Sequence, residues 1–454
     1  MEVFDMIIIG SGQGGTPLAK KMAGAGRKTL LVEKRFVGGT CVNDGCTPTK
    51  TLLSSARMAY LSRHSRSWGI QTTGVTVDIQ KVMERKEAVV HQLREGSEKG
   101  LRKTEGLTLV IGEAAFLGPE AIRVRTPEGA EKSFTAPTIC IDTGLRPNIP
   151  DLAGLQDTPY LTSTSLLEIR ELPKHLLILG GNYLGLEFAQ MFSRFGSQVT
   201  VLEREMQLLP REDADIAAAV KDILEAEGIR IRTGVQAKRV SPGPPVSVET
   251  EDGTFPGSHL LVAAGRVPNT EALALDKAGI LTDEKGFIQV NKQLETNVKG
   301  IYAIGDVKGG PAFTHVAYND HLILAGNLLE DARLSTAGRQ IPYCMFTDPQ
   351  LGRIGMTERQ ARAAGHDILI AKFPMEHTSR GIETGNTQGL MKAIVDKGSG
   401  KILGAAILGA EGGEVMSVLE MAMLAGLTAE TIRCHVFAHP LYSESLNNLF
   451  MKLT

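Results

Sequence analysis

Two copies of one strand–turn–helix pattern predict an α/β protein with two Rossmann-like dinucleotide-binding domains and a C-terminal α+β domain. The first copy begins with the apolar run Met6 to Ile9, which enters the glycine-rich turn G-S-G-Q-G-G. The second begins with Leu176 to Leu179 and enters G-G-N-Y-L-G. The segment after about Pro342 has strand and helix patterns but no such turn, so we expect a separate domain there.

Each part of the first copy has a physical role. A short apolar run is typical of a strand buried on both faces of a parallel sheet. Gly10 makes the tight turn, Gly12 lets the backbone approach a pyrophosphate, and Gly15 lets the following helix pack on the strand. A second strand over 29–32 ends at Glu33, 23 residues after Gly10, which is the separation expected of an acid that binds a ribose.

The second copy repeats this layout with one departure. A helix is expected through Phe195, and a strand over 198–202 ends at Glu203, again 23 residues after Gly180. Asn182 occupies the place of the second glycine. Asparagine tolerates unusual backbone angles but carries a side chain, which works against close approach of the backbone to the phosphates.

The two copies share a later motif but differ in length. The motif is T-G-L-R-P-N in the first copy and A-G-R-V-P-N in the second, and the first copy is 49 residues longer. Most of the extra residues lie in 38–100, which includes two closely spaced cysteines. A further segment, Ile301 to Val307, is expected to be a strand that delivers Asp306 to a glycine-rich turn. In the C-terminal segment we expect strands over 394–396 and 403–408 and a helix over 415–425.

The composition argues against several classes of protein. The 49 Lys and Arg residues are balanced by 51 Asp and Glu, so the net charge of −2 provides no electrostatic footprint for nucleic acid or anionic lipid. No apolar stretch reaches the length of a membrane span, and the start lacks the pattern of a signal peptide. Five cysteines are too few for a secreted disulfide scaffold, so we expect a cytoplasmic protein.

The motif G-G-T-C-V-N-D-G-C-T-P-T-K places Cys41 and Cys46 five positions apart. In a regular helix this spacing separates the Cα atoms by about 8–9 Å, more than the roughly 7 Å that a disulfide can bridge. The pair must therefore straddle an irregular turn, for which Gly45 would provide backbone freedom. With a helix starting near Thr47, Cys46 lies at its N-terminus and Lys50 on the same face, and both features favour a thiolate. We interpret the pair as a redox-active disulfide, since half of a zinc site would need two more nearby ligands.

A second constellation, H-V-F-A-H-P-L-Y-S-E, runs from His435 to Glu444. A dithiol that exchanges with a substrate needs a base, and histidine titrates near neutral pH. Glu444 could orient His439 if the loop after Pro440 folds back, although the spacing alone leaves open that His439 is a plain surface residue. His435 is interpreted as a surface histidine. The remaining cysteines are expected to be buried structural thiols: Cys140, Cys344 and Cys434.

The cysteine motif together with H-P-L-Y-S-E resembles the flavin-dependent pyridine nucleotide–disulfide oxidoreductases, the group of dihydrolipoamide dehydrogenase, glutathione reductase and mercuric reductase. The resemblance covers essentially the whole chain. Within the group, F-A-H-P-L-Y-S-E-S-L-N-N-L-F and I-P-Y-C-M-F-T-D-P-Q look most like the reactive-chlorine-resistance, mercuric-reductase-like reductases. The resemblance to this family implies an FAD-binding domain of residues 1–148 and 270–335, an NAD(P)H-binding domain of residues 149–269 and a dimerisation domain of residues 341–454.

The resemblance also implies which residues bind the cofactors and react. FAD contacts are implied at Gly10, Ser11, Gly12, Gly14, Gly15, Glu33, Lys34, Gly39, Thr40, Lys50, Ala115, Gly144 and Asp306. Nicotinamide dinucleotide contacts are implied at Gly180, Gly181, Tyr183, Leu184, Gly185, Glu203, Arg204 and Gly265. By the same resemblance, Cys46 contacts the flavin, Cys41 exchanges with substrate, and Lys50 pairs with Glu187 beside the flavin ring. His439 and Glu444 would act on the disulfide of the other subunit of a homodimer.

Three departures from the family pattern stand out: Asp44, Thr47 and Asn182. The Asp44 carboxylate should oppose thiolate formation or repel anionic substrates. The chain ends L-F-M-K-L-T with only Cys434 in its last 100 residues, and it retains His439. This pattern argues against mercuric reductase in the strict sense and against a large thioredoxin reductase, both of which use a second cysteine pair near the C-terminus.

The sequence therefore predicts a homodimeric, FAD-dependent NAD(P)H oxidoreductase that uses NADH in preference to NADPH. Its expected electron acceptor is a small electrophile: a hypohalous or hypothiocyanous oxidant, a small disulfide, or a metal ion. No resident metal, nucleic acid or membrane is expected to bind. Dihydrolipoamide dehydrogenase is the main alternative. Mercuric reductase and a redox-sensing flavoprotein without turnover are further alternatives.

Overall fold

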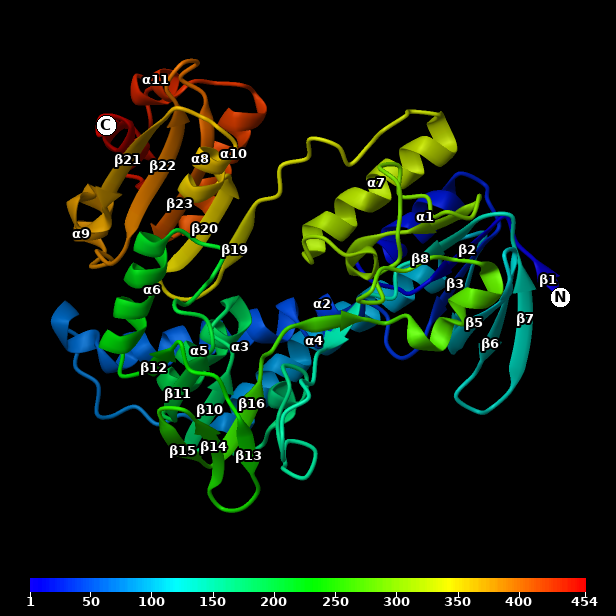
Figure 1. The fold of residues 1–454 in the computed structure, drawn as a ribbon, viewed down its shortest axis with the longest axis horizontal. Helices are drawn as coiled ribbons and strands as arrows, with labels where there is room; N and C mark the ends of the chain where they lie inside the picture. Colours follow the sequence, from blue (N-terminus) through cyan, green and yellow to red (C-terminus); the bar gives the residue numbers. More distant parts are fainter. The chain divides into compact units, whose positions relative to one another are not determined.

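The computed structural model describes all residues, 1–454, and these form two compact units. Unit 1 comprises Met1–Thr51, Met83–Asn148 and Gly265–Arg339. Unit 2 comprises Leu52–Val82, Ile149–Ala264 and Gln340–Thr454. Each unit contains a parallel sheet in which one strand leads into one of the two glycine turns (Figure 1).

Unit 1 is built on a five-stranded parallel sheet with the strand order β18-β8-β2-β3-β4. In that order the strands are Ile301–Ala303, Ile139–Ile141, Met6–Ile9, Thr29–Glu33 and Leu107–Ile111. Strands β2 and β3 are buried along their whole length, which explains their continuous apolar sequence. One face of the sheet packs against α1 (Gly15–Gly24) and α7 (Thr314–Glu330).

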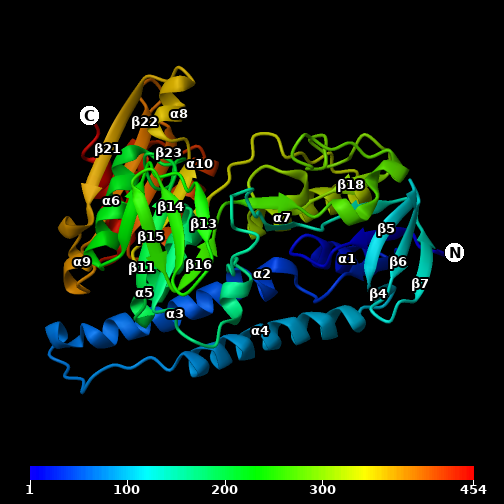
Figure 2. The ribbon, with the colours of Figure 1, turned by 60° about the horizontal axis from the view of Figure 1, so that its bottom comes forward.

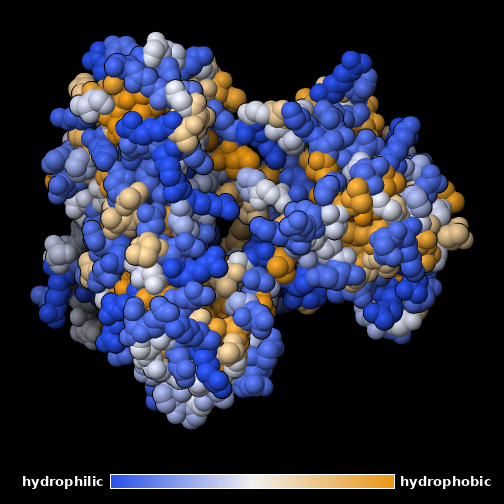
Figure 3. Space-filling model, in the orientation of Figure 1, coloured by the Kyte–Doolittle hydropathy of each residue, from blue (hydrophilic) through white to orange (hydrophobic).

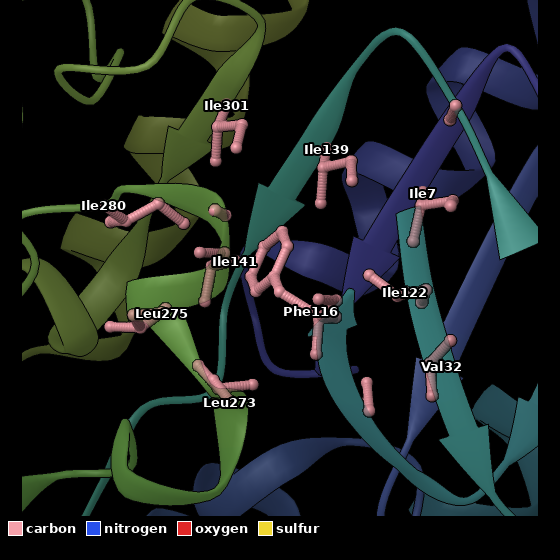
Figure 4. Close-up of a cluster of buried hydrophobic side chains, with 14 of the residues drawn as sticks. Ile7, Val32, Phe116, Ile122, Ile139, Ile141, Leu273, Leu275, Ile280 and Ile301 are labelled. Atoms are coloured by element: carbon pink, nitrogen blue, oxygen red, sulfur yellow. The ribbon is translucent and has the colours of Figure 1, made fainter. Parts of the chain in front are cut away.

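A four-stranded sheet, β1-β7-β6-β5, covers the other face of this parallel sheet. Its strands, in that order, are Glu2–Val3, Glu131–Thr135, Ala121–Arg125 and Glu113–Gly118. Figure 4 shows Phe116 of β5 directed at Ile139 and Ile141, with Ile7 in the same cluster. Phe116 is fully buried, and burying such a side chain contributes about 1.5–3 kcal/mol.

Two sequence-based boundaries are corrected by the structure. The strand expected over Ile301 to Val307 ends at Ala303, and Asp306 lies in the 3₁₀ helix η5 (Gly305–Lys308). The cause is Gly305, whose φ of +68° turns the chain out of the extended conformation. The helix expected over 415–425 is α10, Gly412–Leu424.

The long insertion in the first copy is mostly helical. It contains α2 (Gly39–Asn43), α3 (Cys46–Arg63), η1 (Ser65–Trp68) and α4 (Ile79–Arg102). Figure 2 shows α3 and α4 as long helices. The boundary between the units falls inside α3, after Thr51. No helix of the chain combines the length and the apolar character needed to cross a bilayer.

Unit 2 contains the second parallel sheet, with the strand order β12-β11-β10-β16. These strands are Arg230–Thr233, Gln198–Glu203, His175–Leu179 and His259–Val262. Helix α5 (Tyr183–Phe195) follows the glycine turn, and α6 (Ala214–Ala226) precedes β12. A small antiparallel sheet is formed by β13 (Arg239–Ser241), β14 (Val246–Thr250) and β15 (Gly253–Gly257).

The C-terminal part of unit 2 is an antiparallel sheet with helices, in the strand order β19-β20-β23-β22-β21. The strands are Tyr343–Met345, Gln350–Gly355, Ile402–Gly409, Leu390–Asp396 and Ile368–Pro374. The helices are α8 (Glu358–Ala363), α9 (Ser379–Glu383), α10, α11 (Ala429–Arg433) and α12 (Ser445–Phe450). A buried lysine, Lys392, links this part to the loop before α6 through Asp213, at 3.2 Å. The α+β architecture expected from the sequence is therefore present.

Candidate active site

The four glycines of the first turn lie where a side chain would clash. A Cβ atom on Gly10 would lie 2.2 Å from the carbonyl oxygen of Asp142, and one on Gly12 would lie 2.8 Å from the Asp142 carboxylate. A Cβ atom on Gly15 would lie 2.1 Å from the carbonyl oxygen of Gly10, and one on Gly14 would lie 2.8 Å from Ile304 Cδ1. The turn therefore presents bare backbone at the start of α1, which is the cradle that a pyrophosphate needs.

Glu33 is anchored directly beside this turn at the end of β3. Its Oε2 accepts hydrogen bonds from the backbone N of Ser11 at 3.0 Å and from Ser11 Oγ at 2.5 Å. Its Oε1 accepts one from the backbone N of Arg35 at 2.8 Å. The carboxylate thus occupies the position from which an acid binds the ribose of a dinucleotide.

Two further acids of unit 1, Asp142 and Asp306, are close enough to act on each other electrostatically. Burial raises the pKa of Asp142 well above its usual value, although its Oδ2 accepts a hydrogen bond from Gly15 N at 2.7 Å. Burial also raises the pKa of Asp306, while Arg266 Nη1, 3.0 Å from its Oδ2, acts in the opposite direction. The glycine turn, Glu33 and Asp306 together are suited to binding FAD, with the turn at the pyrophosphate and the acids at hydroxyl groups of the cofactor.

The two cysteines of the motif lie on two consecutive helices of unit 1. Cys41 belongs to α2, and Cys46 is the first residue of α3, one residue before the expected start. Hydrogen bonding to Cys46, followed by burial, raises the pKa of Cys41 well above its usual value, while Thr314 and Lys50 act to lower it. A raised pKa favours the protonated form of Cys41, so Cys46 is the better candidate for the thiolate.

Gly45 has a different role from the one expected. It does not adopt a positive φ, so backbone freedom is not what requires glycine there. A Cβ atom at this position would instead lie 2.9 Å from the carbonyl oxygen of Thr40. Close approach of a similar kind occurs at Gly39, where a Cβ atom would lie 2.8 Å from Gly12 Cα. The redox loop therefore packs directly on the first glycine turn.

Thr314 is a site residue that sequence reasoning missed. It is the first residue of α7, and its Oγ1 lies 3.4 Å from Cys46 Sγ. A hydroxyl at this distance can donate to a thiolate. The two residues are 268 positions apart, and a threonine after Phe313 carries no pattern that would connect it to the cysteines.

The second glycine turn repeats the geometry of the first inside unit 2. Gly180 has a φ of +117°, and a Cβ atom there would lie 2.5 Å from the carbonyl oxygen of Ala263. A Cβ atom on Gly185 would lie 2.1 Å from the carbonyl oxygen of Gly180. Glu203 Oε2 accepts a hydrogen bond from Gly181 N at 2.6 Å, as Glu33 does from Ser11. These residues fit a second dinucleotide.

Asn182 is accommodated without backbone strain. Its φ is −101°, and it caps α5 by accepting a hydrogen bond from Tyr183 N at 3.0 Å. The Tyr183 ring lies 5.2 Å from the Tyr343 ring in an edge arrangement, and Leu184 is half-buried beside it in the sequence. Asn182, in the place of the usual glycine, thus provides a helix cap. Its side chain also accepts from the Tyr183 N–H, one of the groups at the helix start that could otherwise bind a phosphate.

The motif shared by both copies forms a pair of strands in unit 1. Gly144 precedes β9 (Leu145–Pro147) and Gly265 precedes β17 (Arg266–Pro268), and these two strands pair antiparallel. Lys34 is exposed and forms an ion pair with Glu113 at 2.7 Å. Ala115 lies half-buried in β5.

The loop after Pro440 folds back as the histidine hypothesis requires. His439 Nδ1 lies 3.0 Å from both carboxylate oxygens of Glu444, and the same carboxylate accepts a hydrogen bond from Leu441 N at 3.2 Å. Glu444 is largely shielded, whereas the His439 side chain is 69% exposed. An exposed, oriented imidazole can serve a group outside its own chain.

Glu187 lies in α5 of unit 2 and is 3% exposed. Its Oε1 accepts a hydrogen bond from the backbone N of Phe346 at 2.8 Å. Lys50 belongs to unit 1, so its pairing with Glu187 stays a prediction.

The expectation that all three remaining cysteines are buried is confirmed only for Cys140. Cys140 is fully buried and Cys344 is half-buried, but Cys434 is exposed. Cys434 follows the short helix α11 at the surface, and its Sγ donates to Glu430 at 3.2 Å. No group of three or more His, Cys, Asp or Glu side chains is placed to hold a metal ion.

Comparison with known proteins places the chain in a family. Residues 4–320 match the family described as pyridine nucleotide-disulphide oxidoreductase, and residues 341–450 match its dimerisation domain. The chain is 38% identical to the probable pyridine nucleotide-disulfide oxidoreductase RclA of Escherichia coli (strain K12), with 99% of each chain covered. It is 35% identical to the mercuric reductase of Staphylococcus aureus, covering 94% of this chain and 78% of that protein. It is 36% identical to the dihydrolipoyl dehydrogenase of Bacillus subtilis (strain 168), covering 97% and 94%.

A solved structure agrees with these relationships. The Cu(II) complex of the HOCl-induced flavoprotein disulfide reductase RclA from Escherichia coli superposes with a TM-score of 0.92, at 38% identity and with 99% of each chain covered. The two glycine turns, the cysteine pair and the C-terminal domain are thus parts of one known architecture. The chain belongs to the pyridine nucleotide–disulphide oxidoreductase family and is an FAD-dependent disulfide reductase that takes its electrons from a pyridine nucleotide.

Proposed function

We propose that the enzyme passes two electrons from NADH through FAD to a Cys41–Cys46 disulfide, and that the resulting dithiol reduces a small oxidant or disulfide. The observation that carries this proposal is the position of the cysteine loop, which packs on the first glycine turn through Gly39 and Gly12. With a disulfide acceptor, the dithiol becomes a disulfide and the acceptor leaves as two thiols. With hypochlorous acid, the products besides the enzyme disulfide are water, chloride and a proton.

The two cysteines have different tasks in this proposal. Cys46 lies at the start of α3 and 3.4 Å from Thr314 Oγ1, and it would hold the thiolate beside the flavin. FAD, when bound, would accept a hydride from the nicotinamide and pass two electrons to the disulfide. Cys41 attacks the acceptor. Because its pKa is raised, Cys41 needs a base before it can attack. Lys50 and Glu187 would pair beside the flavin ring.

The proposed base is His439 of the partner subunit, oriented by Glu444. This assignment requires a homodimer, which the matched dimerisation domain supports. The C-terminal domain exposes large apolar side chains that an interface would cover: Ile382, Met421, Leu424, Val436 and Leu441. Hydrophobic patches are visible among hydrophilic areas on the face of this domain in Figure 3.

Residues 1–148 and 270–335 are assigned to FAD binding, 149–269 to nicotinamide binding and 341–454 to dimerisation. The first assignment is supported by the sheet of unit 1, which joins β2 and β3 to β18 through β8. The second is supported by the turn at Gly180, which lies in a sheet of its own. A cytoplasmic location would give the enzyme access to a pool of reduced nicotinamide.

The acceptor proposed first is a hypohalous or hypothiocyanous oxidant or a small disulfide, because a full-length relative is described as an HOCl-induced flavoprotein disulfide reductase. A metal ion is a proposed side substrate, since that relative was solved as a Cu(II) complex. Dihydrolipoyl dehydrogenase activity is the second candidate, supported by the similar identity to that enzyme.

Steady-state NADH oxidation with a panel of acceptors tests the proposal. The panel is hypothiocyanous acid, hydroxyethyl disulfide, lipoamide, Cu(II) and Hg(II). We expect kcat/KM for hypothiocyanous acid or the disulfide to exceed that for lipoamide by at least about tenfold, or about 1.4 kcal/mol. Lipoamide as the best acceptor would identify a dihydrolipoyl dehydrogenase, and no turnover with any acceptor would indicate a redox-sensing flavoprotein.

NADH is expected to be preferred over NADPH. Glu203 ends β11, and its carboxylate is held by Gly181 N and Glu205 N, where it can accept from a free ribose diol and repel a 2′-phosphate. The neighbouring cation, Arg204, is 77% exposed and paired with Glu205 at 3.1 Å. The measurement is kcat/KM with each nicotinamide at a fixed acceptor concentration. A value for NADPH tenfold above that for NADH would contradict the assignment of Glu203.

A further inference from the structure

Two arginine side chains contact Asn43 and Asp44, which lie between Cys41 and Cys46 in the sequence. Arg94 Nε donates to Asn43 Oδ1 at 2.7 Å, and Arg35 forms an ion pair with Asp44. The guanidinium carbon of Arg94 lies 4.0 Å from the centroid of the Phe36 ring, and that of Arg35 lies 5.2 Å from it. The aromatic ring therefore supports both cations through cation–π contact.

The two arginines have different partners and so different effects. Asn43 is neutral and 6% exposed, and its Nδ2 donates to the backbone oxygens of Val37 and Gly39. The hydrogen bond from Arg94 thus fixes the position of the Asn43 side chain without changing the charge there. Asp44 carries a charge, and its side chain is only 19% exposed. The contact with Arg35 therefore also cancels a charge.

Asp44 is the one carboxylate in the sequence between residues 34 and 77. It lies three residues after Cys41 and two before Cys46, so its Cα is at most about 11 Å from one cysteine Cα and about 7 Å from the other. A carboxylate at such distances, if unpaired, shifts a thiolate equilibrium by roughly threefold to tenfold. Two further polar groups act on Cys41: the cation of Lys50 on α3 and the neutral hydroxyl of Thr314 on α7.

We propose that Arg35 is a specificity-determining residue of the redox centre, because its ion pair with Asp44 cancels the carboxylate between the two cysteines and keeps the dithiol reactive toward anionic acceptors. This inference rests on the proposed roles of Cys41 and Cys46. Arg35 is well suited to the task, since its backbone N is already fixed by Glu33 Oε1 at 2.8 Å. That bond survives a side-chain substitution, so loss of the charge can be separated from loss of FAD.

The first test is a double-mutant cycle on thiolate formation. Arg35→Gln, Asp44→Asn and the double variant are reduced to the dithiol state, and the long-wavelength thiolate-to-flavin absorbance is titrated against pH. Arg35→Gln should raise the midpoint by roughly half to one unit, and this shift should shrink at high salt. Asp44→Asn alone should lower the midpoint, and the double variant, which lacks both charges, should titrate close to the unsubstituted enzyme. Arg123→Gln, which removes an exposed arginine paired with Glu131 in unit 1, is the matched control.

The second test uses three small disulfides of different charge: dithiodipropionate, hydroxyethyl disulfide and cystamine. Arg35→Gln should lower kcat/KM for the anionic disulfide by roughly threefold to tenfold more than for the neutral one. The cationic disulfide should show no such loss. Adding Asp44→Asn to Arg35→Gln should restore kcat/KM for the anionic disulfide.

Equal losses on all three disulfides would overturn the proposal, as would a midpoint that stays raised in the double variant, because either result means that Arg35 acts through structure. FAD content measured for each variant confirms that the comparison is made on loaded enzyme. The proposed roles of Cys41 and Cys46, on which this inference rests, fail if the unsubstituted enzyme shows neither the thiolate band nor disulfide turnover. Failure of the Arg35 proposal can therefore be distinguished from failure of the proposed function.

Discussion

Replacing Cys46 with serine should remove the long-wavelength band that appears on partial reduction and should lower disulfide turnover by on the order of 10³-fold or more. The reason is that Cys46 is placed to hold the thiolate, at the N-terminus of α3 and within reach of Thr314. A serine hydroxyl neither ionises near neutral pH nor forms a disulfide. The measurements are the absorbance spectrum during titration with NADH and the steady-state rate with a disulfide acceptor.

Two other cysteine variants sharpen this experiment. Cys41→Ser should also lose turnover but keep the band, because the thiolate on Cys46 remains. Cys434→Ser should change neither readout, since Cys434 is exposed on the C-terminal part of unit 2 and paired only with Glu430. A band that survives in Cys46→Ser and disappears in Cys41→Ser would show that the two roles are reversed.

Replacing His439 with alanine should slow turnover with a disulfide acceptor by roughly 10²–10⁴-fold, the usual effect of removing a general acid–base group. The raised pKa of Cys41 makes a base necessary, and the leaving thiolate of the acceptor needs a proton in return. An acceptor that leaves as a stable anion should show a smaller loss. The measurement is kcat/KM on both acceptor types, together with the rate of flavin reduction by NADH.

The control for this variant is His435→Ala, which removes an exposed histidine four residues earlier on the same segment. It should leave turnover close to that of the unsubstituted enzyme. Equal and small losses on both acceptor types would remove His439 from the mechanism. If flavin reduction slows as much as turnover, His439 has a structural role at the dimer interface instead.

The site residues that depend on local chemistry were accessible from the sequence. Gly10, Gly15 and Glu33 follow a pattern in which each residue type answers a requirement of the neighbouring backbone, and the structure shows the close approaches that exclude any side chain. The fold-back of Glu444 onto His439 was also accessible, because only five positions separate them. Cys434 was misjudged because cysteine is usually buried, and only its position after α11 places it at the surface.

Short-range patterns in the sequence were enough to predict the α/β architecture, the two glycine turns and the cysteine pair: continuous apolar runs, glycines that must lack a Cβ, and a helix start beside Cys46. Only the tertiary packing shows that Thr314 meets Cys46 and that Arg35 pairs with Asp44. It also shows that Gly45 is required by the carbonyl oxygen of Thr40 and not by its own φ. Such contacts depend on how elements pack in space, and a hydroxyl or a guanidinium has the same local sequence signature whether or not a partner lies within reach.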